Sequence, residues 1–407
     1  MQQKKIVIIS MMTMAVFAFQ YCSKNESGTG GGITSPVVVD PYANIKIAFG
    51  TNIDPANLIN YANQSRPAYI GGKDNTGANP ITNAKATLGR VLFYDKNLSI
   101  DNSIACGSCH KQQFAFSDTA IASKGVAGGL TARHSMRLIN SRYAVETKFF
   151  WDERAATLEQ QTTTPVKDHA EMGFSGLSGR PGIANLLVKL QGIGYYNELF
   201  KFVYGDINVT EARMQECLAQ FVRSIQSFDS KYDAGRATVP NDGAPFPNFT
   251  AQENQGKQLF LAPPVFDATG TRISGGAGCN ACHNAPEFDI DPNSGNNGII
   301  GKIPPGIGID ILVTRAPSLR DLTNNAGIQN GPLMHTGNLL TLQNAIGHYG
   351  TINIAPGNTN LDPRLRPNGQ GQKLNFTAAE VNSLVAFLRT LSGTNVYTDT
   401  KWGNPFK

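Results

Sequence analysis

The sequence has few charged side chains and no long apolar run beyond its N-terminus. Asp, Glu, Lys and Arg make up 16% of the 407 residues, and no basic run is dense enough to bind nucleic acid. Strand-like alternation of apolar and polar residues is also rare. The 42 Gly and 22 Pro are typical of a loop-rich globular protein rather than a disordered or coiled-coil one. A chain of this length fits about two domains of ordinary size.

The N-terminus has the pattern of an export signal. Lys4 and Lys5 precede an apolar stretch from Ile6 to Phe19, which is too short for a comfortable membrane span. Cys22 and a Ser/Gly-rich stretch follow, so a lipid-anchored lipoprotein and ordinary secretion with an incidental Cys both stay open. We predict a signal peptide over residues 1–22, a flexible tether over 23–40, and a periplasmic protein that meets a membrane only through such an anchor.

Cysteine is scarce, and its spacing argues against a disulfide framework. Four of the six Cys residues lie in two motifs, Cys106-Gly-Ser-Cys109-His110 and Cys279-Asn-Ala-Cys282-His283, and Cys22 lies in the signal region. The remaining Cys217 belongs to a helical pattern of apolar residues spaced three and four apart. We predict that it is a small buried apolar residue.

A Cys-x-x-Cys pair followed at once by His is typical of covalent haem attachment. The two thiols add across the haem vinyl groups, and the imidazole binds the iron from one face. Zinc is the alternative for a Cys pair, but an adjacent His fits a tetrahedral site poorly. A thioredoxin-like redox pair would not explain the His. We therefore predict two covalently bound haem c groups, held by four thiols and two iron ligands: Cys106, Cys109, Cys279, Cys282, His110 and His283.

The chain contains one structural unit twice. Leu88–Phe93 precedes the first motif and Gln255–Phe260 precedes the second, and each predicted helix carries a Gly where it must pack closely. Capping boxes, Thr250 with Glu253 and Thr377 with Glu380, are expected to start the helix before the second motif and the helix that closes the second unit. A helix over Met214–Phe228 is expected to close the first unit, and a Pro/Gly-rich segment over 229–248 links the units. The predicted fold class is mainly α, with two cytochrome c-like haem domains (41–240 and 241–407) joined by long loops.

Function depends on the other face of each iron, and few side chains could bind there. After the signal region, the available Met and non-motif His residues are Met136, Met172, Met214, Met334, His134, His169, His335 and His348. No His lies between His110 and His134, so the first iron is expected to keep an open face. The second motif has His335, His348 and Tyr349 downstream.

An open haem that handles peroxide needs a side chain that moves a proton between the two oxygens. The segment from Trp151 to Gln161, followed by Glu171, offers the required polar groups. The plainer interpretation is a helix that starts at Trp151, with Glu159 in solvent and Glu171 on a loop.

These residues together resemble the bacterial di-haem cytochrome c peroxidase family, which includes the MauG-type protein oxidases. The resemblance runs from about Leu88 to Tyr349 and is carried by segments in one fixed order: Leu88–Asp95, the two haem motifs, Phe149–Arg154, Gln161, Glu171–Met172, Ala316–Arg320, His335–Gly337 and Thr341–Ala345.

The resemblance implies roles for individual side chains. Peroxide would react at the first haem, with Glu171 as general acid/base and Gln161 as a polar orienting group. Trp151 would relay electrons between the haems, and Arg320 and His335 would contribute to cofactor binding. The second haem would receive electrons from a periplasmic cytochrome c or cupredoxin.

Three departures from the family pattern matter. Some relatives gate the first haem with a loop His, but the loop Ile121–Thr131 has none, so no activation step is expected. The sixth ligand of the second haem, Met in many relatives, matches Tyr349, as in MauG-like members, and the adjacent His348 is the alternative ligand. A Ca²⁺ ligand of relatives matches His134, a poor ligand for a hard cation, although Asn330 and Pro332 match the other calcium positions.

The sequence thus predicts a peroxidase that reduces hydrogen peroxide to water with electrons from a periplasmic donor. The alternatives are a MauG-like oxidase that modifies a partner's side chain, and a non-enzymatic di-haem electron carrier. The carrier is disfavoured because no Met or His is well placed for the first iron.

Overall fold

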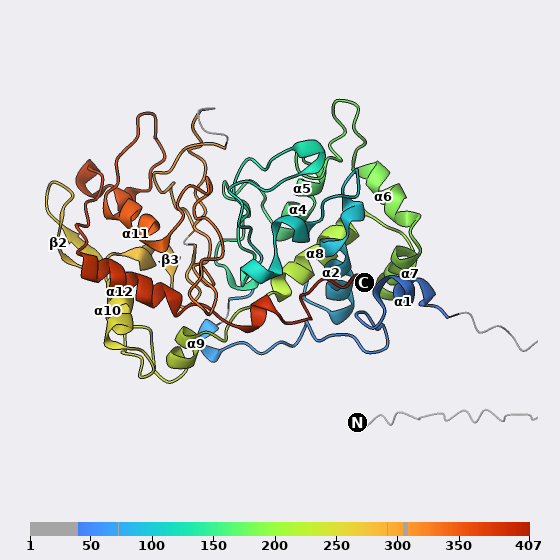
Figure 1. The fold of residues 1–407 in the computed structure, drawn as a ribbon, viewed down its shortest axis with the longest axis horizontal. Helices are drawn as coiled ribbons and strands as arrows, with labels where there is room; N and C mark the ends of the chain where they lie inside the picture. Colours follow the sequence, from blue (N-terminus) through green and yellow to red (C-terminus); the bar gives the residue numbers. More distant parts are fainter. Residues whose placement is uncertain (1–39, 72, 291, 304–307) are drawn as a thin grey trace, which may run out of the picture. The chain divides into compact units, whose positions relative to one another are not determined.

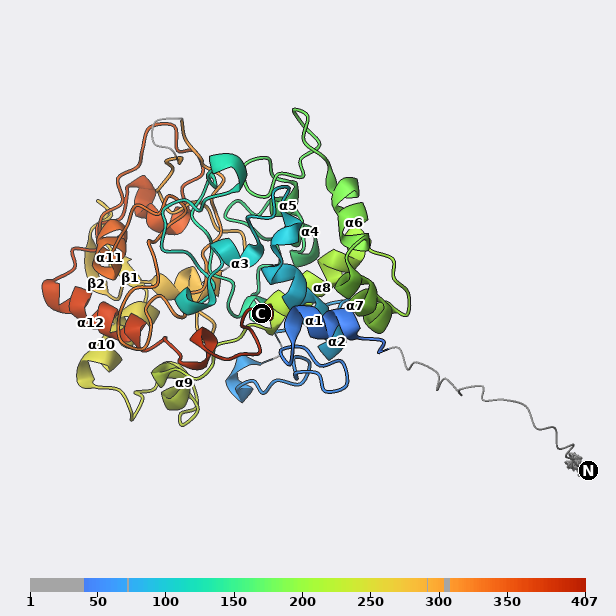
Figure 2. The same cartoon turned by 45° about the vertical axis from the view of Figure 1, so that its right-hand side comes forward.

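The protein is described by a computed structural model that covers residues 40–71, 73–290, 292–303 and 308–407. Helices dominate this part of the chain, as the sequence predicts (Figures 1 and 2). The helices of the first half are α1 Ala43–Phe49, α2 Asn83–Tyr94, α3 Cys106–Cys109, α4 Leu158–Thr162, α5 Thr164–Lys167, α6 Ile183–Gln191, α7 Gly194–Tyr204 and α8 Glu211–Ser224. Those of the second half are α9 Lys231–Arg236, α10 Ala251–Leu261, α11 Leu342–Gly350 and α12 Ala378–Arg389.

Strand structure is limited to two small antiparallel pairs in the second half of the described chain. β1 Pro264–Phe266 pairs with β2 Arg272–Gly275, and β3 His283–Asn284 pairs with β4 Asp289–Ile290. Long loops connect most of the helices. The mainly α class predicted from the sequence is therefore confirmed.

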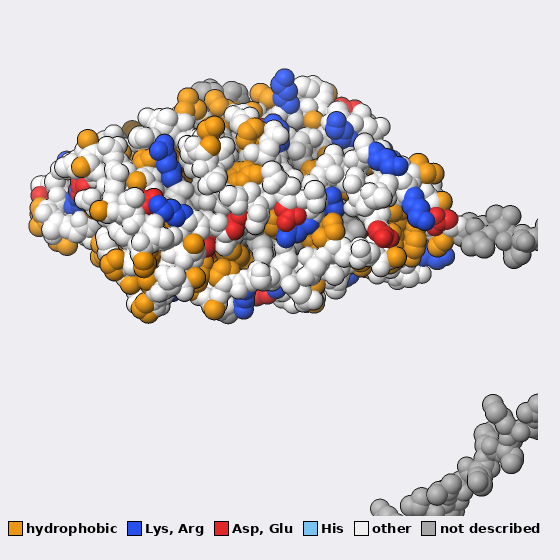
Figure 3. All heavy atoms as spheres, turned by 60° about the horizontal axis from the view of Figure 1, so that its bottom comes forward, with side chains coloured by type: hydrophobic (Ala, Val, Ile, Leu, Met, Phe, Trp, Pro, Cys, Tyr) orange, Lys and Arg blue, Asp and Glu red, His pale blue; other side chains and the backbone are white. Residues whose placement is uncertain are grey.

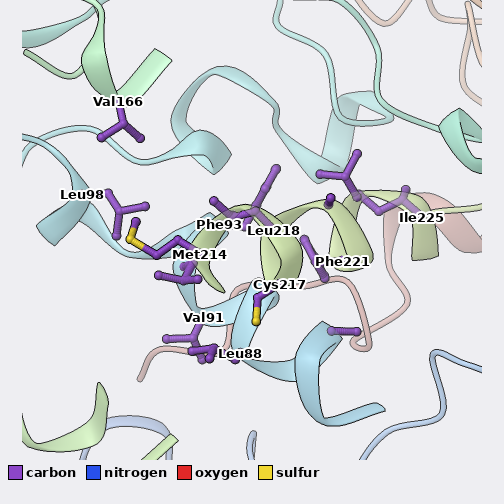
Figure 4. Close-up of a cluster of buried hydrophobic side chains, with 14 of the residues drawn as sticks. Leu88, Val91, Phe93, Leu98, Val166, Met214, Cys217, Leu218, Phe221 and Ile225 are labelled. Atoms are coloured by element: carbon purple, nitrogen blue, oxygen red, sulfur yellow. The ribbon is translucent and has the colours of Figure 1, made fainter. Parts of the chain in front are cut away.

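In the first half, α2 and α8 pack tightly against each other. A Cβ built on Gly89 of α2 would lie 1.9 Å from the carbonyl oxygen of Cys217 on α8, so the helices meet backbone to backbone at this point. Cys217 is fully buried, as predicted, and lies near Leu88 and Val91 of α2 (Figure 4). The helix predicted over 214–228 instead ends at Ser224, because Ile225 adopts an extended backbone conformation.

The second half repeats this arrangement with α10 and α12. A Cβ on Gly256 of α10 would lie 1.8 Å from the carbonyl oxygen of Ser383 on α12. Both helices begin with the capping boxes predicted from the sequence, Thr250 with Glu253 and Thr377 with Glu380. The prediction that each motif is preceded by a helix with a close-packing Gly is thus confirmed in both halves.

The buried apolar residues form two large clusters, one in each half. The first contains α2, α7 and α8, and the second contains α10 and α12. Val396 and Trp402, near the C-terminus, join the first cluster rather than the second. The Trp402 indole N–H donates to the carbonyl oxygen of Ser224 at 3.1 Å. The last residues of the chain therefore return to the first half.

No helix within the described residues is long and apolar enough to cross a membrane. On the face drawn in Figure 3, the Lys and Arg side chains are dispersed and interspersed with Asp and Glu. The predicted signal peptide, Cys22 and the tether up to residue 39 lie outside the described residues.

Candidate active site

The first Cys-x-x-Cys-His motif forms the short helix α3 followed directly by His110. The Ser108 hydroxyl oxygen accepts from the backbone N–H of Ala105 at 3.0 Å and closes the turn. Tyr94 at the end of α2 covers Gly107, where a Cβ would lie 2.6 Å from the tyrosine ring. The Nδ1 atom of His110 lies 3.2 Å from the carbonyl oxygen of Phe116. Such a bond fixes the ring orientation of a metal-binding His.

The second motif is built in a similar way on the 3-10 helix η6 (Cys279–Ala281). Gly278 before it has a left-handed backbone conformation, and the Asn280 side-chain oxygen accepts from the N–H of Ala285 at 2.9 Å. Burial lowers the pKa of His283 to about 4, so its ring is neutral and suited to bind a metal.

Each motif His is followed by a buried Phe with a left-handed backbone. Phe116 has φ of 59° and Phe288 has φ of 55°, and both side chains are fully buried. The carbonyl oxygen of Phe116 contacts the ring of His110, and that of Phe288 lies near the ring of His283. The two halves therefore place a Phe carbonyl oxygen beside the imidazole in a similar way, but only His110 is hydrogen-bonded to it, since Nδ1 of His283 has no hydrogen-bond partner among the described residues.

A cavity of about 280 Å³ opens beside the first motif, and Cys106, Cys109 and His110 line it. Glu171, Gln161 and Trp151 line the same cavity. The structure thus brings together the three side chains that the sequence predicted for catalysis with the first predicted haem site.

Glu171 is held in this cavity by its backbone. Its N–H donates to Asp168 Oδ1 at 3.0 Å, and its carbonyl oxygen accepts from the N–H of Val126 at 3.0 Å. Burial, and then the nearby charge of Asp168, raise the pKa of the Glu171 carboxyl to about 7. A carboxyl that titrates near neutral pH can both accept and return a proton.

The loop Ile121–Thr131 packs directly against this segment. A Cβ on Gly125 would lie 1.9 Å from the carbonyl oxygen of Ala170, and one on Gly129 would lie 2.5 Å from the same oxygen. The loop without His therefore fixes the backbone beside Glu171.

Gln161 lies on α4. The plainer interpretation of the sequence placed the start of this helix at Trp151, but the helix starts later. Thr157 caps this helix by accepting from the N–H of Gln160 at 3.2 Å, and the helix begins at Leu158. A helix start at Trp151 is therefore wrong, because the chain makes a tight turn there. Glu159 is not a solvated residue either, since it pairs with the buried Arg223.

Trp151 lies where the two halves of the sequence meet. Its indole N–H donates to the carbonyl oxygen of His134 at 2.8 Å, and its own carbonyl oxygen accepts from the N–H of Arg315 at 3.0 Å. The ring of His335 lies 6.2 Å from the indole, in an edge-on arrangement. His335 itself is buried, with Nε2 2.8 Å from the carbonyl oxygen of Gly301.

Arg154, from the segment Phe149–Arg154, also lines the cavity. Four further cationic side chains that the sequence analysis missed line it as well: Lys124, Arg133, Arg137 and Arg315. The buried Nε of Arg137 has no hydrogen-bond partner among the described residues. Arg133 pairs with Asp152 at 2.9 Å and with Asp310 at 2.7 Å, and so joins the two halves next to Trp151. No spacing pattern singled out these residues, because they lie on irregular loops.

At the second motif, the geometry distinguishes Tyr349 from His348. Burial, and to a smaller extent the nearby thiols of Cys282 and Cys279, raise the pKa of Tyr349, and the Asn297 amide donates to its hydroxyl at 3.3 Å. The Nε2 atom of His348 instead lies 2.8 Å from the carbonyl oxygen of Asn297. Asn297 is a further residue that the sequence analysis missed, because a single Asn in a loop carries no pattern.

Arg320 is fully buried and tied into an ion pair. Its two terminal nitrogens contact the carboxylate of Asp233 at 2.9 and 3.0 Å, and the carbonyl oxygen of Pro286 accepts from it at 2.9 Å. Only its Nε lacks a partner among the described residues. The predicted role of Arg320 in cofactor binding stays a prediction, with most of its hydrogen-bonding capacity already used by protein groups.

The residues considered for calcium also have protein partners. Nδ1 of His134 lies 2.9 Å from the carbonyl oxygen of Ala120, and the Asn330 amide donates to Asp321 and Tyr397 at 2.8 Å each. Within the part of the chain that the structure describes, no group of three or more His, Cys, Asp or Glu is arranged to hold a metal ion. The sequence left calcium binding open, and these contacts do not decide it.

The fold and the site define a class of protein, a mainly helical oxidoreductase with two haem-type motifs and, beside the first, a cavity lined by Glu171. Residues 83–238 match the family model of di-haem cytochrome c peroxidases. Methylamine utilization protein MauG of Methylophilus methylotrophus is 30% identical over 327 residues, which are 78% of this chain and 84% of that protein. Cytochrome c551 peroxidase of Nitrosomonas europaea is 27% identical over 321 residues, which are 76% of this chain and 80% of that protein.

Solved structures agree with this result. The crystal structure of a MauG-like protein associated with microbial copper homeostasis is 26% identical, with a TM-score of 0.63 over 84% of this chain and 99% of that chain. The di-haem peroxidase BthA from Burkholderia thailandensis, at 21% identity, shares the fold with a TM-score of 0.54 over 86% of this chain and 92% of that chain. The chain belongs to the di-haem cytochrome c peroxidase family. It is accordingly a peroxidase-type oxidoreductase of a haem-containing family.

Proposed function

We propose that this protein is a periplasmic di-haem peroxidase that reduces hydrogen peroxide to water with electrons from a small cytochrome c or cupredoxin. The observation that carries the proposal is Glu171, whose carboxyl has a pKa raised to about 7 and lines one cavity with Cys106, Cys109 and His110. A proton-transfer group is thus poised beside a predicted haem site.

The residues present fit two covalently attached haems. Cys106 and Cys109 would hold the first haem, with His110 as its ligand, and Cys279, Cys282 and His283 would do the same for the second. Arg137 fits a haem propionate, because its buried Nε has no other partner among the described residues. When bound, the first haem supplies an iron with one open face for peroxide.

Glu171 moves the proton in this mechanism. Its carboxylate would accept a proton from one oxygen of hydrogen peroxide and return it to the other oxygen, which leaves as water. The electrons that break the O–O bond would come from the haem when it is bound. Gln161, on the same cavity wall, orients the peroxide by hydrogen bonding.

We propose that Trp151 relays electrons between the two halves. It contacts the backbone of His134 in the first half and the backbone of Arg315 in the second. The two buried clusters support two cytochrome c-like domains, for which we propose the bounds 41–240 and 241–407. Tyr232 packs in the second cluster, and Val396 and Trp402 pack in the first, so both domains include side chains from beyond their own bounds. The second domain would take electrons from the donor and pass them through Trp151.

We also propose that the enzyme needs no activation step. The loop Ile121–Thr131 has no His that could bind the first iron, and its glycines pack against Ala170 next to Glu171. The acid/base group is therefore in position without a change in this loop.

Turnover with a reduced small cytochrome c tests the proposal directly. The oxidised holoprotein, without prior reduction, should oxidise the cytochrome rapidly when peroxide is added. Failure to oxidise either a cytochrome or a cupredoxin, with both haems present, would rule out donor-linked peroxide reduction.

One observation favours a second candidate, a MauG-like oxidase of a partner protein. Tyr349 lies near Cys279 and Cys282 while His348 is bonded to Asn297, which supports a tyrosine ligand at the second iron. A phenolate ligand lowers the haem potential and favours highly oxidised iron over electron delivery. A long-lived near-infrared band after peroxide addition, with slow cytochrome oxidation, would support this candidate over the first.

A further inference from the structure

One acidic side chain in the first half accepts hydrogen bonds from two tyrosines. Asp95 lies at the end of α2 and is 3% exposed. Its Oδ2 atom accepts from the hydroxyl of Tyr195 at 2.6 Å and from that of Tyr196 at 2.8 Å. Its Oδ1 atom accepts from the backbone and side-chain N–H groups of Asn97 at 2.8 and 2.9 Å. All four partners are donors, so the carboxylate is arranged purely as an acceptor.

The cluster of Asp95, Tyr195 and Tyr196 extends from the first haem motif toward the surface. Tyr196 is fully buried in the first apolar cluster, and Cys106 of the first motif packs against the same cluster. The ring of Tyr195 lies 4.8 Å from that of Tyr196, and Tyr195 is partly exposed. A buried phenol near the cofactor site is therefore in ring contact with a second phenol that solvent can reach.

A proton acceptor decides which tyrosine can be oxidised. A phenol that loses an electron becomes a strong acid and must release its proton to form a stable neutral radical. Burial, and then the charge of Asp95, hold the pKa of Tyr196 well above its usual value, so the phenol carries its proton at rest. Asp95 is placed to receive that proton during oxidation.

Tyr94 provides the contrast within the same core. Its ring covers Gly107, between the two Cys residues of the first motif, so it is also close to the predicted haem. Its hydroxyl, however, donates to the backbone carbonyl oxygen of Trp402 at 2.7 Å. A carbonyl oxygen is a very weak base and cannot take the proton. Of these two tyrosines, Tyr196 alone has a partner that permits oxidation.

We propose that Tyr196 and Tyr195, joined through Asp95, form a redox-active pair that carries oxidising equivalents from the first haem site to the surface when the electron donor is absent. This inference rests on the proposed reaction of that site with peroxide. The pair is a protective side route and takes no part in donor-linked turnover.

The steps balance in electrons and protons. Tyr196 gives one electron to the oxidising equivalent that peroxide leaves at the first haem site, and gives its phenolic proton to Asp95 Oδ2. Tyr195 then gives one electron to the Tyr196 radical, which regains its proton from Asp95 while the Tyr195 proton replaces it there. A small one-electron reductant in solution, of the ascorbate type, finally returns an electron to Tyr195, which regains its proton from Asp95.

Electron paramagnetic resonance of freeze-quenched samples tests the pair. The oxidised holoprotein is mixed with one equivalent of hydrogen peroxide, without donor or reductant, with tyrosine either unlabelled or ring-deuterated. We expect a tyrosyl radical signal that narrows on deuteration in the wild type and persists in Tyr94→Phe. Tyr196→Phe should lose it, and so should Asp95→Asn, which keeps a hydrogen-bond acceptor but removes the base. In Tyr195→Phe the radical should persist on Tyr196 and decay more slowly when ascorbate is added.

Other outcomes overturn the inference. A signal that survives in Tyr196→Phe, or one that is lost in Tyr94→Phe, would show that proximity and not Asp95 selects the oxidised residue. Turnover with a reduced cytochrome should be the same in Tyr196→Phe as in wild type, and a large loss would contradict a side route. If the haem spectrum responds to peroxide but no tyrosine is oxidised, the pair alone is rejected. If the haem spectrum does not respond, the pair and the proposed function are both rejected.

Discussion

At the scale of single residues, Glu171 is the side chain on which the proposed chemistry depends. It combines a position in the cavity beside His110 with a pKa raised by burial. Replacing it by Gln preserves shape and removes the proton-transfer group. We expect the bimolecular reaction of Glu171→Gln with peroxide to be slower by about 10²–10⁴-fold in stopped-flow measurements, the usual contribution of a general acid/base.

Asp168→Asn is a weaker matched change, since Asp168 lies outside the chemistry but adds to the shift of Glu171. We expect it to lower the pKa of Glu171, which raises the ionised fraction of that carboxyl at neutral pH, and to change the rate only slightly. An unchanged rate in Glu171→Gln would remove Glu171 from the mechanism.

The raised pKa of Glu171 also predicts a pH dependence. The carboxylate form must accept the peroxide proton, so the reactive fraction grows as pH rises through about 7 and is complete above it. Below that value, each pH unit should lower the rate roughly tenfold. A peroxide reaction measured from acid to alkaline pH should show this rise in wild type and none in Glu171→Gln. A rate that falls as pH rises toward 7 would contradict the assignment.

The two candidate ligands of the second iron, Tyr349 and His348, can be distinguished by mutation. Because the Tyr349 hydroxyl lies near the thiols of the second motif, Tyr349→Phe should change the resonance spectrum of that haem and raise its potential. His348→Gln, the control, can keep a hydrogen bond to the carbonyl oxygen of Asn297 and should leave the spectrum unchanged. The reverse pattern would assign the ligand to His348.

Single functional residues could be predicted from the sequence where they belong to a short motif or to a segment shared with the family. The Cys and His residues of the motifs follow from spacing alone, and Gln161, Glu171 and Trp151 follow from the family resemblance, although their roles remain to be tested. Arg137 and Asn297 could not be predicted, because their importance comes from partners far away in the sequence. The ion pair that buries Arg320 against Asp233 could not be predicted either, because its two residues are also far apart in the sequence.

At the scale of elements, two helix pairs built on glycine support the two motifs. A Cβ at Gly256 would collide with the backbone of Ser383, which cannot move aside without separating α10 from α12. Gly256→Ala should therefore lower the free energy of unfolding by about 1–3 kcal/mol, as overpacking does. Thermal or denaturant unfolding of the holoprotein measures this.

Gly347 in α11 is the control, because a Cβ there meets nothing within 4 Å. Gly347→Ala should stabilise the protein by about 0.5–1 kcal/mol, since Ala costs less backbone entropy in a helix. Equal effects of the two substitutions would show that the close helix contact does not matter.

Capping boxes and close-packing glycines could be predicted because they are encoded within a few neighbouring residues. The end of α8 at Ser224 and the turn at Trp151 could not, because apolar periodicity continues past the point where tertiary contacts redirect the chain. Ile225 is fully buried in the core although it no longer belongs to the helix.

At the scale of the whole molecule, the two halves of the sequence meet around Trp151. Arg133 joins them by pairing with Asp152 beside the tryptophan and with Asp310 in the second half. Arg133→Gln should slow electron transfer between the haems without slowing the peroxide reaction, because it loosens the Trp151 contact and leaves Glu171 in place. Flash or stopped-flow reduction of one haem measures this transfer.

Arg142→Gln is a suitable control, since Arg142 pairs with Asp74 inside the first half. It should leave the transfer rate unchanged. An equal effect of both substitutions would mean that Arg133 acts only through general stability.

The account as a whole requires one iron with a vacant coordination position beside Glu171 and a second iron bound by two protein ligands. Electron paramagnetic resonance of the oxidised holoprotein, with Tyr349→Phe alongside, reports both irons directly. We predict a high-spin signal from the first haem in wild type and variant, and a change in the second haem's signal in the variant alone. Two low-spin haems in every redox state would contradict the account and leave only an electron carrier.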